Sequence, residues 1–333
     1  MTESNIIISS RIRLARNLRG VPFPNKLTAQ AAREYVSRPI SKILSDNCNL
    51  TVINIMDLTQ TEQHILHERR LISKDLFQNA LNGIVALNND ESISVMVNEE
   101  DHIREQCILP GLFLLECFEE LNNVDDELLS GLNIAFDSKL GFLTSSPTNL
   151  GTGMRASVMC FLPALTILNK INDSILNMTK LGITVRGGYG EGSNAEGYMY
   201  QVSNSSTLGI SEFDIIRNVT EAVRALAKEE AAARVVLYRE QATGLTDEVF
   251  RAWGILTNCF KLDMHEFLML LSKIKMGVAL GIIGLKNAGL LDELDVKCRP
   301  YNLIKTSGRE LKGEEIDIFR ADYLGKLLMG GRS

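Results

Sequence analysis

The residues of this chain that could do chemistry are arginines and acids in four short segments. The first segment reads SSRIRLAR from Ser9 to Arg16 and follows an apolar run. Alternate side chains of a β-strand share a face, so Arg11 and Arg13 would project together. The planar guanidinium fork of arginine matches the oxygens of a phosphate. The segment therefore indicates recognition of an oxyanion, with a solvated edge strand as the alternative.

The second segment places three acids and an arginine at the end of a predicted strand. It reads VNEEDHIR and includes Glu99, Glu100 and, four residues after Glu100, Arg104. Polar groups at strand ends are common in active sites. A carboxylate beside an arginine could handle a cationic and an anionic group at once. His102 has no second ligand at a suitable spacing, so we expect it to be a structural hydrogen-bonding residue and predict no metal site.

The third segment, SPTNLGTGMR from Ser146 to Arg155, contains a glycine turn. We expect this turn to lead into a buried helix over 155–171, because the apolar density after Arg155 is high. Free backbone N–H groups and the positive end of such a helix would attract an anion. An ordinary capped helix start is the alternative. The chain has no GxxxxGK[ST] sequence, so the segment is not a Walker A loop.

The fourth segment, RGGYGEGSNA from Arg186 to Ala195, directly follows a predicted strand. Its four glycines permit a loop that moves or approaches a ligand closely. A loop that carries Arg186 and the carboxylate Glu191 would suit a lid that closes over a phosphate donor. A turn-rich hairpin is the alternative.

The elements around these segments predict an α+β fold. Strands are predicted at residues 5–9, 51–55, 83–87, 92–97, 133–136, 183–186 and 198–203, and further helices at 59–68 and 111–121. Beyond Ser203 only helical patterns remain, with a capping serine at Ser211 and a long helix that ends near Glu240. Helices are then predicted at 246–259, 263–283 and 313–329. We expect a boundary at 241, with one domain over 1–241 and an all-helical domain over 242–333.

Composition excludes several classes of protein. The chain has 333 residues, of which 45% are hydrophobic and 23% charged, so a mainly disordered chain is excluded. The net charge of −6 argues against a general binder of nucleic acids or anionic membranes. No secretory signal and no apolar stretch of about 20 residues is present. The six cysteines form no CxxC pair, which favours a reducing cytoplasm.

Together, the four segments and the stretch QVSNSSTLG resemble the phosphagen kinase family. These ATP:guanidino phosphotransferases include creatine kinases and arginine kinases. The resemblance covers Ile6 to about Glu240, and the stretches NEEDHIR and PTNLGTGMRAS are its most specific parts. Within the family the chain is most similar to the bacterial protein arginine kinases, through its GEGSNAEG loop and its helical carboxy-terminal region. The resemblance implies a mostly antiparallel sheet flanked by helices, followed by an all-helical domain.

The resemblance also implies an activity, which is phosphorylation of arginine residues in proteins with ATP as donor and Mg²⁺ as cofactor. The implied site has a phosphate cradle, a Ser9 that lies in the same nucleotide motif, and catalytic acids. The cradle is Arg11, Arg13, Arg104, Arg155 and Arg186, and the acids are Glu100, its neighbour Glu99, and Glu191 from the loop. The implied setting is a cytoplasmic stress response. The implied partners are proteins with exposed arginines, a heat-shock repressor, an activator protein, a Clp unfoldase and a second copy of the chain, with no direct contact to nucleic acid or membrane.

The chain departs from the family pattern at a few positions. Ser146 stands where relatives usually carry a cysteine, and Ile316 precedes Asp317 where related protein arginine kinases have an Arg-Asp pair. Arg70 and Met159 stand where metazoan relatives place histidines near the adenine. Ser146 and Ile316 keep open the alternative of a catalytically reduced adaptor protein. A second alternative is a kinase of free arginine, which would share all of the chemistry and differ only in its acceptor.

Overall fold

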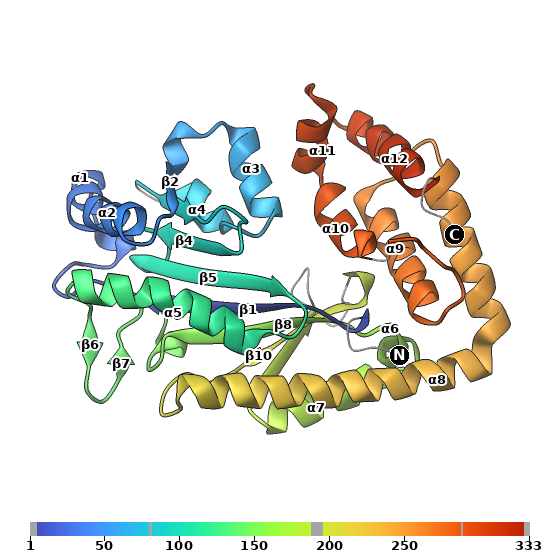
Figure 1. Ribbon diagram of the computed structural model, residues 1–333, viewed down its shortest axis with the longest axis horizontal. Coiled ribbons are helices and arrows are strands. Elements are labelled where there is room, and N and C mark those ends of the chain that lie inside the picture. The colour runs from blue at the N-terminus through green and yellow to red at the C-terminus, as the bar shows by residue number, and fades with distance from the viewer. Residues whose placement is uncertain (1–4, 80–81, 188–195, 288, 330–333) are drawn as a thin grey trace.

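The computed structural model describes residues 5–79, 82–187, 196–287 and 289–329. Its centre is an eight-stranded antiparallel sheet in the order β2-β3-β4-β5-β1-β8-β10-β9 (Figure 1). The strands of this sheet are β1 (Ile7–Arg16), β2 (Thr51–Asn54), β3 (Ile84–Leu87), β4 (Ile93–Val97), β5 (Ile103–Pro110), β8 (Met154–Phe161), β9 (Ile183–Gly187) and β10 (Met199–Asn204). A two-stranded ribbon, β6 (Phe136–Asp137) and β7 (Gly141–Phe142), projects from it. The predicted α+β fold with a mostly antiparallel sheet is confirmed.

The helices begin with a continuous helical segment of α1 (Ala29–Ala31), the π-helical η3 (Ala32–Ser37) and α2 (Arg38–Asp46). The helices that follow in the sheet-containing part are α3 (Gln60–Glu68), α4 (Lys74–Asn79), α5 (Leu114–Gly131), α6 (Pro163–Ile167) and α7 (Ile171–Lys180). The helices of the carboxy-terminal part are α8 (Glu212–Asn258), α9 (Met264–Ala279), α10 (Leu290–Lys297), α11 (Pro300–Ser307) and α12 (Glu314–Met329).

One face of the sheet is apolar and covered by helices. Alternation along β1 and β8 places Ile12, Leu14, Ala156 and Val158 on this face, all of them fully or almost fully buried. Helices α5, α2 and the first part of α8 pack there and form one large core with the strands. On the opposite face, α3 and α4 lie over β2 to β4 and enclose a smaller cluster that includes Met96. Residues of α9 and α10 border the other end of this face, at Ser9 and Met199.

The prediction of a helix over 155–171 is wrong, because Met154–Phe161 forms the strand β8. Buried Met154, Ala156, Val158 and Cys160 alternate with the partly exposed Arg155 and Met159 and the buried polar Ser157. This is the two-residue period of a strand with one apolar face. The strand β8 lies between β1 and β10 in the middle of the sheet and is well buried. Its many apolar residues therefore resembled those of a buried helix. The strand β5 was also not predicted.

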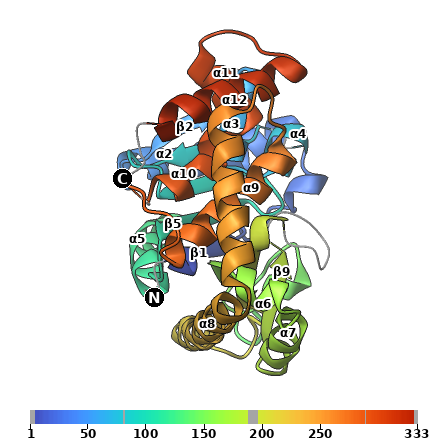
Figure 2. The same cartoon turned by 90° about the vertical axis from the view of Figure 1, so that its right-hand side faces the viewer.

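The carboxy-terminal part is helical and is joined to the sheet by α8. This helix runs along the sheet and then turns up beside α9 and α12 (Figures 1 and 2). Its backbone departs from helical geometry at Gln241, with φ −132° and ψ 25°. The two helices predicted on either side of 241 are therefore one kinked helix, while the boundary between domains at 241 stays a prediction. A second hydrophobic cluster, which includes Trp253, Phe267 and Leu324, lies among α8, α9, α10 and α12.

Among the described residues, we find no helix that combines the length and the apolar composition needed to cross a bilayer.

Candidate active site

Five arginines from four strands lie on the face of the sheet opposite to the one that α5 and α8 cover. Arg13 lies opposite Arg155 across β1 and β8, and Arg11 lies two residues from Arg13 on the same side of β1. Arg104 of β5 lies opposite Ala15, which shares that side of β1. Ser157, on the same side of β8, lies opposite Ser203 of β10. Gln201 shares the side of Ser203 and lies opposite Arg186 of β9, so Arg186 also lies on this side. The prediction that Arg11 and Arg13 project together is confirmed, and the register brings the other three arginines to their face.

The three central arginines of this group have unused donors. The Nε–H groups of Arg11, Arg13 and Arg155 are buried and have no hydrogen-bond partner among the described residues. Burial, followed by the charges of Arg104, Arg70 and Arg155, lowers the pKa of Arg11 to about 9. Burial and the charges of its arginine neighbours likewise hold the pKa of Arg13 well below its ordinary value. Buried N–H donors without acceptors are costly, so this face is suited to an anion with many acceptor oxygens.

Two neighbouring acids stand at one end of the arginine row. The turn between β4 and β5 begins at Asn98, whose φ of +59° is left-handed, and contains Glu99 and Glu100. Only 1% of the Glu99 side chain is exposed, against 42% for Glu100. Glu99 accepts hydrogen bonds from Ser73 Oγ at 2.6 Å and from Arg104 Nη1 at 2.5 Å. Glu100 lies 3.3 Å from the same Arg104 nitrogen.

The environments of these acids shift their pKa values in opposite directions. Burial alone would raise the pKa of Glu99, but Arg104 and the hydrogen bonds from Ser73 and the Glu100 N–H lower it overall. The pKa of Glu100 is raised by burial and by the charges of Asp101 and Glu99, against the effect of Arg104. A carboxylate fixed in its ionised form beside one with a raised pKa is an arrangement that suits proton transfer.

The third acid of this segment has a structural role. Asp101 is fully buried and accepts hydrogen bonds from Asn17 Nδ2 at 2.7 Å and from the Ser145 N–H at 2.6 Å. His102 Nδ1 accepts a hydrogen bond from the Leu18 N–H, and its Nε2 lies 2.8 Å from the carbonyl of Pro22. Both side chains therefore hold the turn against the segment after β1. The prediction that His102 is a structural hydrogen-bonding residue is confirmed.

The glycine turn before β8 is closely packed and leads into a strand, not into a helix. Gly153, with φ +63°, packs so closely that an added Cβ would lie 2.7 Å from the carbonyl oxygen of Ala15. Its own carbonyl accepts the Ala15 N–H, and the Thr152 N–H is bonded to the carbonyl of Thr207. The predicted anion site at a helix start is therefore wrong, because the turn is used for close packing and leads into a strand. Arg155 still reaches the arginine face, since it points to that side of β8.

The remaining predicted residues lie in different places. Ser9 is at the far end of β1 from Glu100, and Glu191 lies outside the described residues. Arg16, the last arginine of the first segment, points to the covered face. There it forms a buried ion pair with Asp125 at 2.7 Å and lies over the ring of Phe142. Position in a strand, and not residue type, thus separates Arg16 from Arg11 and Arg13.

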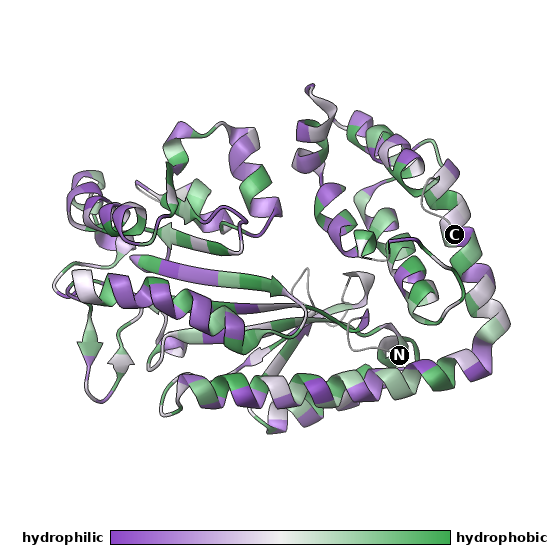
Figure 3. Ribbon diagram, viewed as in Figure 1, coloured by the Kyte–Doolittle hydropathy of each residue, from purple (hydrophilic) through white to green (hydrophobic). Residues whose placement is uncertain are grey.

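A cleft of about 420 Å³ opens beside Arg11. The strand β5 contributes Ile108 to the lining of this cleft. Figure 3 shows β5 changing from hydrophobic to hydrophilic and back along its length. The other lining residues are Ser9, His67, Glu68, Arg70, Ser157, Met159, Gln201 and Arg299. Arg299 comes from the carboxy-terminal part. Sequence reasoning missed it, because no motif surrounds it and because it is far along the chain from the strands that carry the other arginines.

Two family models match the chain. The model described as "ATP:guanido phosphotransferase, C-terminal catalytic domain" matches residues 32–233. The model described as "Protein-arginine kinase McsB C-terminal domain" matches residues 242–331. The first match contains the strands that carry Arg104, Arg155 and Arg186, and the second contains Arg299.

Similar proteins and structures agree with these matches. A protein-arginine kinase of Caldanaerobacter subterraneus subsp. tengcongensis is 41% identical over 330 residues, which are 98% of each chain. A protein-arginine kinase of Pelotomaculum thermopropionicum is 44% identical and covers 97% of this chain and 92% of its own. The crystal structure of a lombricine kinase has a TM-score of 0.62 and 26% identity, and covers 71% of this chain and 69% of its own.

Proposed function

The chain belongs to the ATP:guanido phosphotransferase family, and we propose that its acceptor is the guanidinium group of arginine residues in proteins. Relatives that match nearly its full length are named protein-arginine kinases, which supports this acceptor. The observation that carries the proposal is the shared face of five arginines, with buried unpartnered Nε–H groups at its centre and two acids at one end.

We propose that the nucleotide lies along β1 with its γ-phosphate toward the acids. Arg11 and Arg13 would hold the phosphate chain, and Arg104 would hold its end beside Glu100. Arg155 and Arg186 would approach from the other side. Transfer of a phosphoryl group proceeds through a loose transition state with charge spread over its oxygens, so positioned cations supply most of the catalysis.

Mg²⁺ is proposed to enter with ATP as part of the substrate. Among the described residues, no three acids, histidines or cysteines form a group that could hold a metal ion. Magnesium at kinase sites is commonly bound through phosphate oxygens, water and one or two carboxylates. Glu100, which is half exposed, and the phosphates of ATP would supply these few ligands.

Glu100 is proposed to be the acid that meets the acceptor. A guanidinium ion has a pKa above about 12 and is not nucleophilic until it loses a proton. As its nitrogen forms the P–N bond and the P–O bond to ADP breaks, the proton would pass to Glu100. Glu99 would stay ionised beside Arg104 and orient that arginine. Ser9 and Glu191 keep their proposed roles as a nucleotide-motif residue and a second acid.

The proposed biological setting rests on the resemblance to protein arginine kinases. It comprises a cytoplasmic stress response, a homodimer, control of a heat-shock repressor, an activator protein and delivery of substrates to a Clp unfoldase. Co-purification of the chain with these partners, and the mass of the chain in solution, would test this setting.

The acceptor is tested with labelled ATP and two substrates, a basic protein and free arginine. We expect an acid-labile phosphate on the protein and little on the amino acid. Rapid labelling of free arginine alone would establish the small-molecule kinase, and no labelling of either substrate would favour an adaptor protein.

A further inference from the structure

The carboxy-terminal helical part reaches the cleft beside Arg11. Arg299, the residue before α11, lines this cleft together with Arg70 of the segment after α3. Both guanidinium groups are bound to one carboxylate, since Asp295 accepts from Arg70 Nη2 at 3.0 Å and from Arg299 Nη2 at 3.1 Å. The three side chains form an ion triad, which we call the Arg70–Asp295–Arg299 triad, between the two parts of the molecule.

Other contacts fix the position of this triad. The carboxylate of Glu68 accepts the backbone N–H groups of Tyr301 at 3.1 Å and Asn302 at 2.9 Å. It therefore caps the first turn of α11 from the end of α3. The ring of Tyr301 also stacks on that of His64, with centroids 4.1 Å apart. Figures 1 and 2 both show α11 near α3, in agreement with their contacts.

The triad is also joined to the phosphate-binding face. Gln106 is buried, accepts a hydrogen bond from Arg11 Nη2, and donates one from Nε2 to the carbonyl of Arg70 at 2.7 Å. The main chain of Arg70 is thus held by a side chain that also holds Arg11. Arg70 has a left-handed φ of +66°, which directs the chain out of α3.

The direction of β5 identifies which part of a nucleotide would meet the triad. Arg104 lies beside the acids, and Ile108, which lines the cleft, lies four residues further along the strand, or about 13 Å away. With the γ-phosphate at Arg104, the phosphate chain leads toward Arg11 and the nucleoside extends beyond it. That space is surrounded by the apolar side chains of Ile108 and Met159 and by the guanidinium groups of Arg70 and Arg299. Guanidinium groups stack well on aromatic rings.

We propose that Arg299 binds the nucleoside part of the nucleotide, so that the carboxy-terminal helices complete a cleft formed mainly by the sheet. Asp295 acts as the positioning residue that orients Arg299 and ties it to Arg70. This inference rests on the proposed use of ATP and adds to it a contact from outside the catalytic sheet.

The test compares two probes, ATP and inorganic tripolyphosphate, on wild-type protein and on Arg299→Gln. We expect the variant to bind ATP about tenfold more weakly, with its affinity for tripolyphosphate unchanged, because the latter has no nucleoside. The KM for ATP should rise while kcat at saturating ATP stays near the wild-type value. Asp295→Asn should show the same pattern to a smaller extent, and Arg299→Lys should recover part of the loss.

The matched control is Arg309→Gln, which removes an exposed arginine of the same helical part that does not line the cleft. It should bind both probes as the wild type does. Wild-type affinity of Arg299→Gln for ATP, with a thermal midpoint equal to that of the control, would overturn the inference. Equal losses toward ATP and tripolyphosphate would overturn the assignment to the nucleoside. Failure of the wild-type protein to bind ATP would instead contradict the proposed function itself.

Discussion

Arg13 of β1 lies directly opposite Arg155 of β8 in the antiparallel sheet. Like charges at opposed positions of a sheet are destabilising, and neither Nε–H group of this pair has an acceptor in the described part of the protein. We therefore expect the pair to lower the stability of the protein without ligand and to provide donors for a phosphate chain.

Replacing one member of this pair should raise stability and lower function. For Arg13→Gln we expect the free energy of unfolding without ligand to rise by about 0.5–1 kcal/mol, because the cross-strand repulsion is removed. Urea unfolding measures this change. Tripolyphosphate should stabilise the wild type more than the variant. The control Arg33→Gln removes an exposed arginine elsewhere and should change neither quantity; a destabilised Arg13→Gln would contradict the interpretation.

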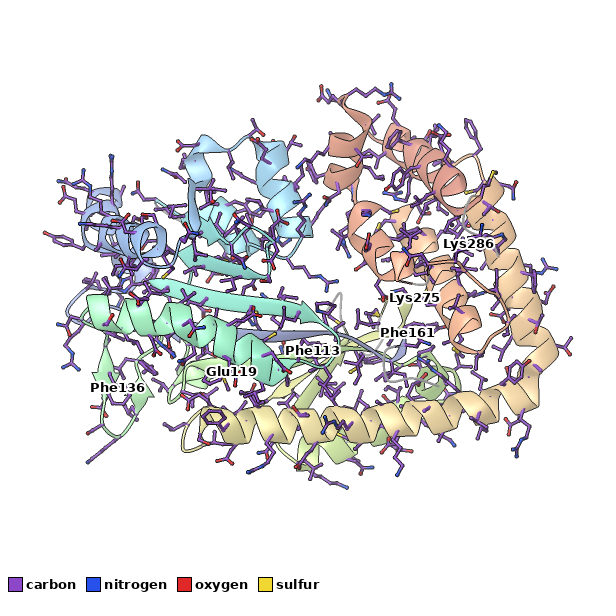
Figure 4. All side chains as sticks on the ribbon, viewed as in Figure 1. Phe113, Glu119, Phe136, Phe161, Lys275 and Lys286 are labelled. Atoms are coloured by element: carbon purple, nitrogen blue, oxygen red, sulfur yellow. The ribbon has the colours of Figure 1, made fainter. Side chains whose placement is uncertain are left out.

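Glu100→Gln should abolish most of the kinase activity. The amide cannot accept the proton of the acceptor guanidinium, so we expect kcat to fall by about 10²–10⁴. ATP binding, measured by calorimetry, should change little because the arginines remain. Glu119→Gln is a matched control, since Glu119 is an exposed acid on α5, the helix that packs on the covered face (Figure 4). Near wild-type turnover of Glu100→Gln would exclude Glu100 as the base.

The pH dependence of kcat should reflect the raised pKa of Glu100. Glu100 must be ionised to accept a proton, so activity should fall as the pH decreases through a pKa above its ordinary value of 4.5. Asp75 is exposed and its charge contributes to the raised pKa of Glu100. Asp75→Asn should therefore move the acid limb of the kcat profile to lower pH. An acid limb that stays in place, or moves to higher pH, would contradict this assignment.

A buried acid on the covered face should limit stability at neutral pH. Both carboxyl oxygens of Glu105 are buried without a hydrogen-bond partner among the described residues, and burial and the charge of Asp125 hold its pKa well above the ordinary value. The unfolded chain therefore ionises first, so this residue's contribution to stability is complete below about pH 4.5 and is lost as the pH rises toward the folded-state pKa.

Glu105→Leu should raise the free energy of unfolding at pH 8 by about 1–3 kcal/mol, because an apolar side chain needs no partner there. Glu105→Gln should flatten the pH dependence of stability with a smaller gain, since it leaves a buried polar group. Denaturant unfolding at pH 5 and pH 8 measures both effects. A wild-type protein whose stability does not decrease over this range would show that Glu105 is ionised in the folded state.

Residue types and local spacing were sufficient for part of the site. The alternation in SSRIRLAR predicted that Arg11 and Arg13 share a face, because the period of a strand is a local property. The sequence places Arg104 four residues after Glu100, and the turn between β4 and β5 brings Arg104 Nη1 to 3.3 Å from Glu100. The same local reasoning did not distinguish Asp101 from its neighbours, since its role depends on Asn17 and on Ser145, which come from other segments.

The sequence by itself determined the types of side chain that can bind a phosphate chain, the family to which they belong, and the α+β composition. Only the tertiary structure decided how these arginines are placed relative to one another and which further residues join them. It paired Arg13 with Arg155 and brought Arg299 to Arg70 from a distant part of the chain. The physical reason is that strand register and helix docking depend on burial of apolar surface over the whole chain, which no single segment specifies.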